Sequence, residues 1–132
     1  MNSPLEHAKA LLARAEDDFY VVRRMEEDAG APTWVIGFHA QQAVEKSLKA
    51  VLSGAGQVYP RTHNLVMLAQ LLNEARIPMP PDAEEFGALT PFGVVLRYEV
   101  TVADEPPAID ISRLDAMISR TLAWAKAQLT GK

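Results

Sequence analysis

The chain has 132 residues, no cysteine and a net charge of −4, and 48% of its residues are hydrophobic. This size predicts a single domain over residues 1–132 with a sizeable core. The net charge argues against non-specific nucleic-acid binding by the whole molecule, and the lack of cysteine excludes disulfides, thiolate catalysis and cysteine-based metal sites.

Hydrophobic periodicity predicts helices from the N-terminus onward. Ser3 is suited to cap the first helix, and Pro4 suits its first position. We expect Thr33 and Thr62 to cap the second and third helices in the same way. The five main helices are predicted near residues 3–28, 33–54, 63–76, 82–89 and 111–129.

The C-terminal half is also predicted to be helical. Pro91 and Gly93 are expected to break the fourth helix, and Asp110 or Ser112 to start the last one. Because every well-defined periodicity is helical, the predicted fold is an all-α, antiparallel up-and-down helical bundle of about five helices. Large apolar side chains are assigned to the core by type, namely Trp34, Phe38, Met67, Met79, Phe86, Phe92, Met117 and Trp124.

The second predicted helix carries an assorted polar row opposite its apolar arc. At 100° per residue, five polar side chains fall within about 120° of one another. A plain solvated face explains this row, since Glu45 and Lys49 are a favourable i,i+4 pair, but a cleft or partner surface explains it as well. Apolar residues also spread around more of this helix than one core needs, which favours a homodimer. The row consists of His39, Gln42, Glu45, Lys46 and Lys49.

Charge is distributed unevenly along the chain. Residues 33–77 carry four basic and two acidic side chains, a balance of +2, whereas each flanking segment has a balance of −3. Chance on small counts is one explanation. The other is an anion-binding region, for which the candidates are Lys46, Lys49, Arg61 and His63.

Three segments carry recognisable sequence motifs. The run FHAQQAVEKSLKA at residues 38–50 resembles the second helix of the HEPN family of small prokaryotic domains. Residues 60–65, PRTHNL, resemble the opening of its third helix, and Arg97 with Tyr98 resembles the Arg-Tyr pair before its last helix. The resemblance implies homodimerisation and, for a protein of this size, pairing with a minimal nucleotidyltransferase in a toxin–antitoxin-like system.

The resemblance also raises a nuclease hypothesis. Many HEPN proteins are metal-independent ribonucleases in which an arginine is followed, after four to six residues, by a histidine. The arginine neutralises the scissile phosphate and the histidine transfers protons. After Arg97 the corresponding positions are Val102, Ala103 and Asp104, and no other arginine has a histidine at this spacing. We therefore assign no catalytic residue and do not expect efficient ribonuclease activity.

Two functions remain open. One is a non-catalytic interaction module. The alternative is a nucleotide- or RNA-binding domain with weak metal-independent ribonuclease activity using His39 or His63, in which arginine and lysine hold phosphate and Tyr98 stacks on a base. Arg97 could instead pair with Glu45 inside the bundle. The predicted ligand-binding set is His39, Gln42, Glu45, Lys46, Arg97 and Tyr98, with Lys49, Arg61 and His63 as secondary candidates.

Neither a metal nor a cofactor is predicted. No histidine has a glutamate three residues before it, as a metal site in a helical bundle would need, and no glycine-rich phosphate loop is present. The chain has no secretory signal and no apolar run long enough to span a membrane, so we expect a cytoplasmic protein without membrane contact.

Overall fold

The computed structural model describes residues 3–95 and 108–131, and in these ranges its regular elements are all helical. The predicted all-α class is therefore confirmed. None of the helices in this described part has the length and apolarity needed to cross a lipid bilayer. The elements are α1 (Pro4–Glu26), α2 (Thr33–Gly54), α3 (Leu65–Glu74), the 3-10 helix η1 (Ala83–Leu89), α4 (Thr90–Val95) and α5 (Ile111–Thr130).

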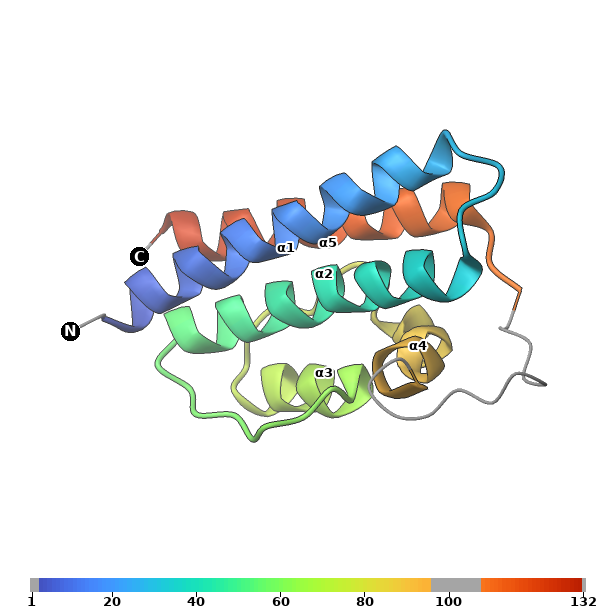
Figure 1. Cartoon of the computed structure of the whole chain (residues 1–132). Coiled ribbons are helices and arrows are strands. Elements are labelled where there is room, and N and C mark those ends of the chain that lie inside the picture. Colours follow the sequence, from blue (N-terminus) through green and yellow to red (C-terminus); the bar gives the residue numbers. More distant parts are fainter. Residues whose placement is uncertain (1–2, 96–107, 132) are drawn as a thin grey trace.

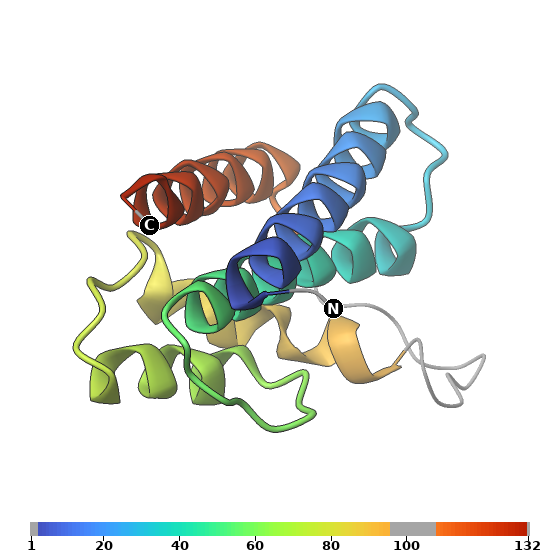
Figure 2. The same ribbon diagram turned by 90° about the vertical axis from the view of Figure 1, so that its left-hand side faces the viewer.

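Helix α2 is the centre of the molecule. It packs against all of the other elements: α1, α3, η1, α4 and α5. Figure 1 shows α1 and α5 on one side of α2 and the short helices α3 and α4 on the other, and Figure 2 shows the same arrangement after a 90° turn. The wide apolar surface of α2 is thus covered within one chain, and it no longer supports the homodimer that we predicted from it.

The starts of the first two long helices follow different rules. At α1, Ser3 Oγ accepts a hydrogen bond from the backbone N–H of Glu6 at 3.1 Å, as the sequence predicted. At α2, the prediction that Thr33 is the cap is wrong. Thr33 is the first helical residue, and the cap position belongs to Pro32, whose side chain makes no capping bond.

The caps of α3 and α5 are short carboxamide and carboxylate side chains. Asn64 Oδ1 accepts from the N–H of Met67 at 3.1 Å, so the prediction that Thr62 caps this helix is wrong by two residues. Thr62 instead accepts a hydrogen bond from the N–H of Asn64, which organises the approach to the helix. Asp110 caps α5 by accepting from the N–H of Arg113 at 3.2 Å.

The predicted fourth helix near residues 82–89 does end where expected, because η1 ends at Leu89. The prediction that Pro91 and Gly93 break it is wrong, because both residues lie inside α4. Pro91 occupies its first turn, where a missing N–H costs nothing. Gly93 lets the backbone approach α2 closely, since a Cβ there would lie 2.6 Å from Gln41 Cδ. A Cβ at Gly37 on α2 would likewise lie 2.2 Å from Cδ1 of Phe92. Two glycines therefore seat α4 directly on α2.

The side chains predicted for the core divide into three groups. Phe86, Phe92 and Met117 are buried, as predicted. Met67, on α3, and Met79, in the segment after α3, are each 39% exposed, so their assignment to the core is wrong. The remaining large side chains are partly buried: Trp34, Phe38 and Trp124.

The close packing of α4 against α2 predicts how a substitution at Gly37 changes stability. Gly37→Ala should lower the free energy of unfolding by about 1–3 kcal/mol, because the buried Phe92 ring must shift. In most helices, replacing glycine by alanine instead raises the free energy of unfolding, by up to about 1 kcal/mol. Urea denaturation measures the change. Gly87→Ala is the control, since its Cβ would lie an ordinary 3.9 Å from Val66. A Gly37→Ala protein as stable as the parent would contradict this packing.

Candidate functional site

The polar row of α2 lies inside the molecule. Gln42 and Glu45 are buried, and no residue of α2 is classed as exposed along its whole length. The interpretation of this row as a solvated face is therefore wrong. Helix α1 covers one edge of the row, and the connection from α2 to α3 reaches the other. The row divides accordingly into two clusters with different partners.

The first group, which we call the Asp18 cluster, joins α2 to α1. Its members are Asp18, His39 and Lys46. Asp18 is buried, and its Oδ1 accepts from His39 Nδ1 at 2.8 Å. Its other oxygen, Oδ2, accepts from Lys46 Nζ at 2.7 Å. One carboxylate from α1 thus holds a histidine and a lysine that lie almost two turns apart on α2.

Asp18 is not among the residues predicted for the site, although the sequence contains a signal for it. Asp18 lies three residues after Ala15 and four residues before Val22, and both of these are buried on the inner face of α1. A carboxylate at such a position must meet a donor or a cation, because a buried unpaired charge is costly. A search for charged residues within the apolar stripe would have found it.

The second group, the Glu45 cluster, joins α2 to the segment that leads into α3. Its members are Gln41, Glu45, Lys49 and His63. Glu45 Oε1 accepts from Gln41 Nε2 at 2.9 Å and from His63 Nδ1 at 2.9 Å. Glu45 Oε2 accepts from Lys49 Nζ at 3.0 Å. Gln41 also donates to the backbone oxygen of His63 at 3.0 Å, which fixes this segment against α2.

Glu45 is held in its charged form by these donors. Burial alone would raise the pKa of Glu45, but the hydrogen bonds from Gln41, Lys49 and His63 outweigh it and hold the pKa below its ordinary value. The charge of Glu45 also affects a residue outside the cluster, because burial and this nearby carboxylate together raise the pKa of Tyr59.

The outer edge of the Glu45 cluster is closed by an aromatic side chain. Lys49 Nζ lies 5.6 Å from the centre of the Tyr59 ring, within cation–π range. The Tyr59 hydroxyl lies 3.3 Å from Nε2 of His7 on α1. Lys49 is thereby enclosed between a carboxylate and a ring, and it does not present a free ammonium group.

The structure separates the predicted site residues. His39 and Lys46 belong to the Asp18 cluster, whereas Glu45, Lys49 and His63 belong to the Glu45 cluster, which Gln42 extends by donating to Gln41 Oε1 at 2.8 Å. Arg61 is exposed and belongs to neither. Arg97 and Tyr98 lie outside the described residues, as does the predicted pair of Arg97 with Glu45.

Each cluster contains a histidine and a lysine of the kind that an acid–base site uses, but both are bound to the cluster's own carboxylate. A buried carboxylate fixes a histidine through Nδ1, which leaves Nε2 as the ring nitrogen available for proton transfer. The lysine that could hold a phosphate is bound to the same carboxylate. Over residues 3–95 and 108–131, no group of three or more histidine, aspartate or glutamate side chains is arranged to hold a metal ion.

Comparison with known proteins gives one match. The family model described as HEPN domain matches residues 8–118, a range that contains every residue of both clusters. No protein with a curated description and no solved structure matches the chain.

The Glu45 cluster generates a pH prediction. Because the pKa of Glu45 is lowered on folding, its stabilisation is present above the ordinary glutamate pKa of about 4.3 and is lost as pH falls through the lower folded value. Glu45→Gln should cost about 3 kcal/mol at pH 7, since it leaves Lys49 without its counter-ion. The deficit should shrink steadily below about pH 4.3.

Urea denaturation across this pH range measures the difference between parent and variant. Glu74→Gln is the control, because Glu74 is exposed and forms no ion pair within the described residues. A deficit for Glu45→Gln that does not change with pH would contradict the assignment.

Proposed function

The chain belongs to the HEPN domain family, and on this premise we propose that it is a homodimeric helical interaction module without efficient catalysis. Its proposed partner is a minimal nucleotidyltransferase, in a system of the toxin–antitoxin kind. The resemblance of residues 38–50 and of Arg97 with Tyr98 to small HEPN proteins supports this pairing. A gene for such a nucleotidyltransferase beside the gene for this chain would strengthen it.

One observation carries the proposed lack of catalysis. Metal-free RNA cleavage needs a proton-transfer group beside a cation that is free to bind the phosphate. Lys46 is bound to Asp18 and Lys49 to Glu45, so the lysine in each cluster already has a carboxylate as its counter-ion. The missing histidine after Arg97 points in the same direction.

A groove between α1 and α5 supports the proposed homodimer. This α1–α5 groove measures about 450 Å³, and Tyr20 at its edge is 61% exposed. Arg23 and the Lys126–Glu16 pair also line it, so it carries both signs of charge. A two-fold contact brings the same surface together from both copies, and a surface with both signs of charge and an exposed aromatic ring is complementary to itself.

The RNA prediction tests the proposed lack of catalysis. Purified protein should leave structured and single-stranded RNA intact, with and without a chelator, in a gel assay under multiple-turnover conditions. Cleavage that disappears in both Arg97→Ala and a single histidine variant, His39→Ala or His63→Ala, would overturn this part of the proposal.

The dimer prediction tests the proposed assembly. Analytical ultracentrifugation at high micromolar concentration should give the mass of a dimer, and Tyr20→Asp should shift the equilibrium to monomer by placing two carboxylates at the two-fold contact. Val58→Asp is the control, since Val58 lies in the exposed connection after α2. A monomeric parent protein would refute the homodimer, and a dimeric Tyr20→Asp protein would refute this interface.

A nucleotide- or RNA-binding function is the second candidate. The observation that favours it is the orientation of His63, whose ring is partly exposed while Nδ1 is fixed by Glu45. Carboxylate-oriented histidines serve as general acids and bases in many enzymes. Thermal stabilisation of the protein by nucleotides, lost in His63→Ala, would favour this function over the interaction module.

A further inference from the structure

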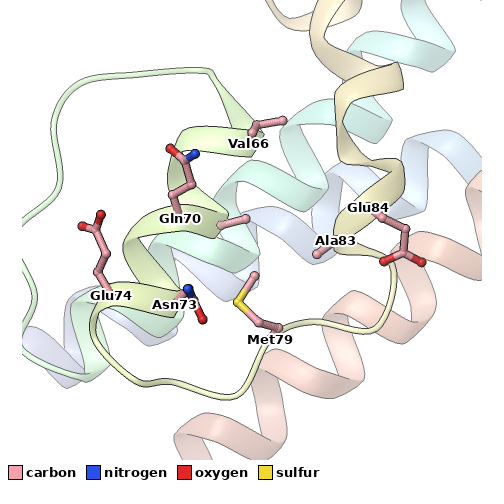
Figure 3. A pocket seen from close by; sticks show the side chains of 8 residues that line it. Val66, Gln70, Asn73, Glu74, Met79, Ala83 and Glu84 are labelled. Atoms are coloured by element: carbon pink, nitrogen blue, oxygen red, sulfur yellow. The ribbon is translucent and has the colours of Figure 1, made fainter.

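The outer side of α3 forms one wall of an open groove that is lined by both apolar and polar side chains. This α3 groove, of about 580 Å³, is bounded by α3, by the segment that follows it and by the start of η1 (Figure 3). Val66 is 45% exposed and Met79 is 39% exposed, and both line the groove. Two of the five exposed large apolar side chains of the described residues therefore line one groove. Exposed apolar side chains that gather in a groove with a polar rim are a feature of binding surfaces.

The local sequence explains why these side chains face outward. Leu65, Leu68 and Leu72 form the buried stripe of α3. Val66 and Gln70 follow a neighbouring stripe, at a spacing of four residues, where η1 lines one wall of the groove and leaves Val66 45% exposed. The chain then turns back after α3 and brings Met79 to the facing wall, as Figure 3 shows. Methionine is a flexible, adaptable contact in binding surfaces.

The charged residues that line the α3 groove are both acidic. Glu74 lies at one end and Glu84 at the other, with Met79 between them (Figure 3). Both carboxylates are exposed, and neither forms an ion pair within residues 3–95 and 108–131. Arg76, only two residues after Glu74, instead lines a separate hollow beside Val51.

The neighbouring carboxylates of η1 are paired, which makes Glu84 distinctive. Asp82 accepts two hydrogen bonds from Arg120, at 2.9 and 3.0 Å, and Glu85 pairs with Arg113. Both pairs tie this segment to α5. Only Glu84 of these three carboxylates lines the α3 groove, and there it meets no cation of the described chain.

We propose that the α3 groove binds a cationic segment of another protein, with an apolar side chain over Val66 and Met79 and lysine or arginine beside Glu74 and Glu84. Charge complementarity favours this occupant, since opposite charges speed association and select partners. RNA is disfavoured because its phosphates would meet two unpaired carboxylates. A second copy using the same face is disfavoured because like charges would face each other.

This inference rests on the proposed role as an interaction module and adds the surface and the chemistry of the partner. The probe is a fluorescein-labelled synthetic peptide with a pair of leucines flanked by lysines. The same peptide with every lysine replaced by glutamate is the second probe. Fluorescence anisotropy of each peptide is measured against the full chain at physiological salt.

The lysine peptide should bind and the glutamate peptide should not. Glu74→Lys with Glu84→Lys should weaken binding at least about tenfold, and Val66→Ser with Met79→Ser should weaken it similarly. Asp17→Lys with Glu27→Lys is the matched control. It makes the same change in net charge on exposed residues of α1 and its C-terminal end, and it should leave the affinity unchanged.

The inference would be overturned by no binding of the lysine peptide, by equal binding of the glutamate peptide, or by an equal loss of affinity in the control variant. Binding of a single-stranded RNA oligonucleotide that is lost in Val66→Ser with Met79→Ser would overturn it in favour of nucleic acid. The assay contains no nucleotidyltransferase and does not depend on the dimer. Its failure therefore removes the groove assignment alone, whereas the sedimentation and RNA experiments test the proposed function.

Discussion

A buried negative charge on the central helix constrains much of this molecule. Glu45 lies on α2, the helix against which every other described element packs. An ion at such a position is tolerated only when donors surround it. Two donors, Gln41 and Lys49, come from α2 itself, and the third, His63, comes from the segment before α3. The same Gln41 lies against Gly93, so the start of α3 and the seat of α4 depend on one polar group.

The Asp18 cluster likewise joins α2 to a neighbouring element through a buried carboxylate, on the other edge of α2. Here the carboxylate comes from α1, and its two partners, His39 and Lys46, come from α2. Each cluster pairs one carboxylate with one histidine and one lysine. Buried ionic groups of this kind contribute little net stability compared with apolar packing, but an unmatched register would leave them unpaired. The clusters therefore favour one alignment of α1, α2 and the connection to α3.

Because the lysines of α2 are paired with carboxylates inside the molecule, the two clusters do not offer an unpaired charge to a ligand. The lysines of α2 are compensated, so the +2 balance of residues 33–77 does not create an open anion site at the clusters. The α1–α5 groove and the α3 groove differ in the charged residues that line them. The α1–α5 groove is lined by both acidic and basic side chains, which suits contact with an identical copy. The charged residues that line the α3 groove are carboxylates alone, which suits a cationic partner.

The sequence by itself determined the helical class, the approximate bounds of the long helices and the family, because periodicity, the Ser3 cap and the run at residues 38–50 are local properties. It also showed that His39 and Glu45 share a helix with two lysines. Which partners they meet was decided only by tertiary structure. Asp18 lies 21 residues before His39, and His63 lies 18 residues after Glu45, so no local rule joins them. The burial of Gln42 and the exposure of Met67 were likewise set by which faces of α2 and α3 other helices cover. Periodicity identifies an apolar face, but it does not say how many neighbours that face will have.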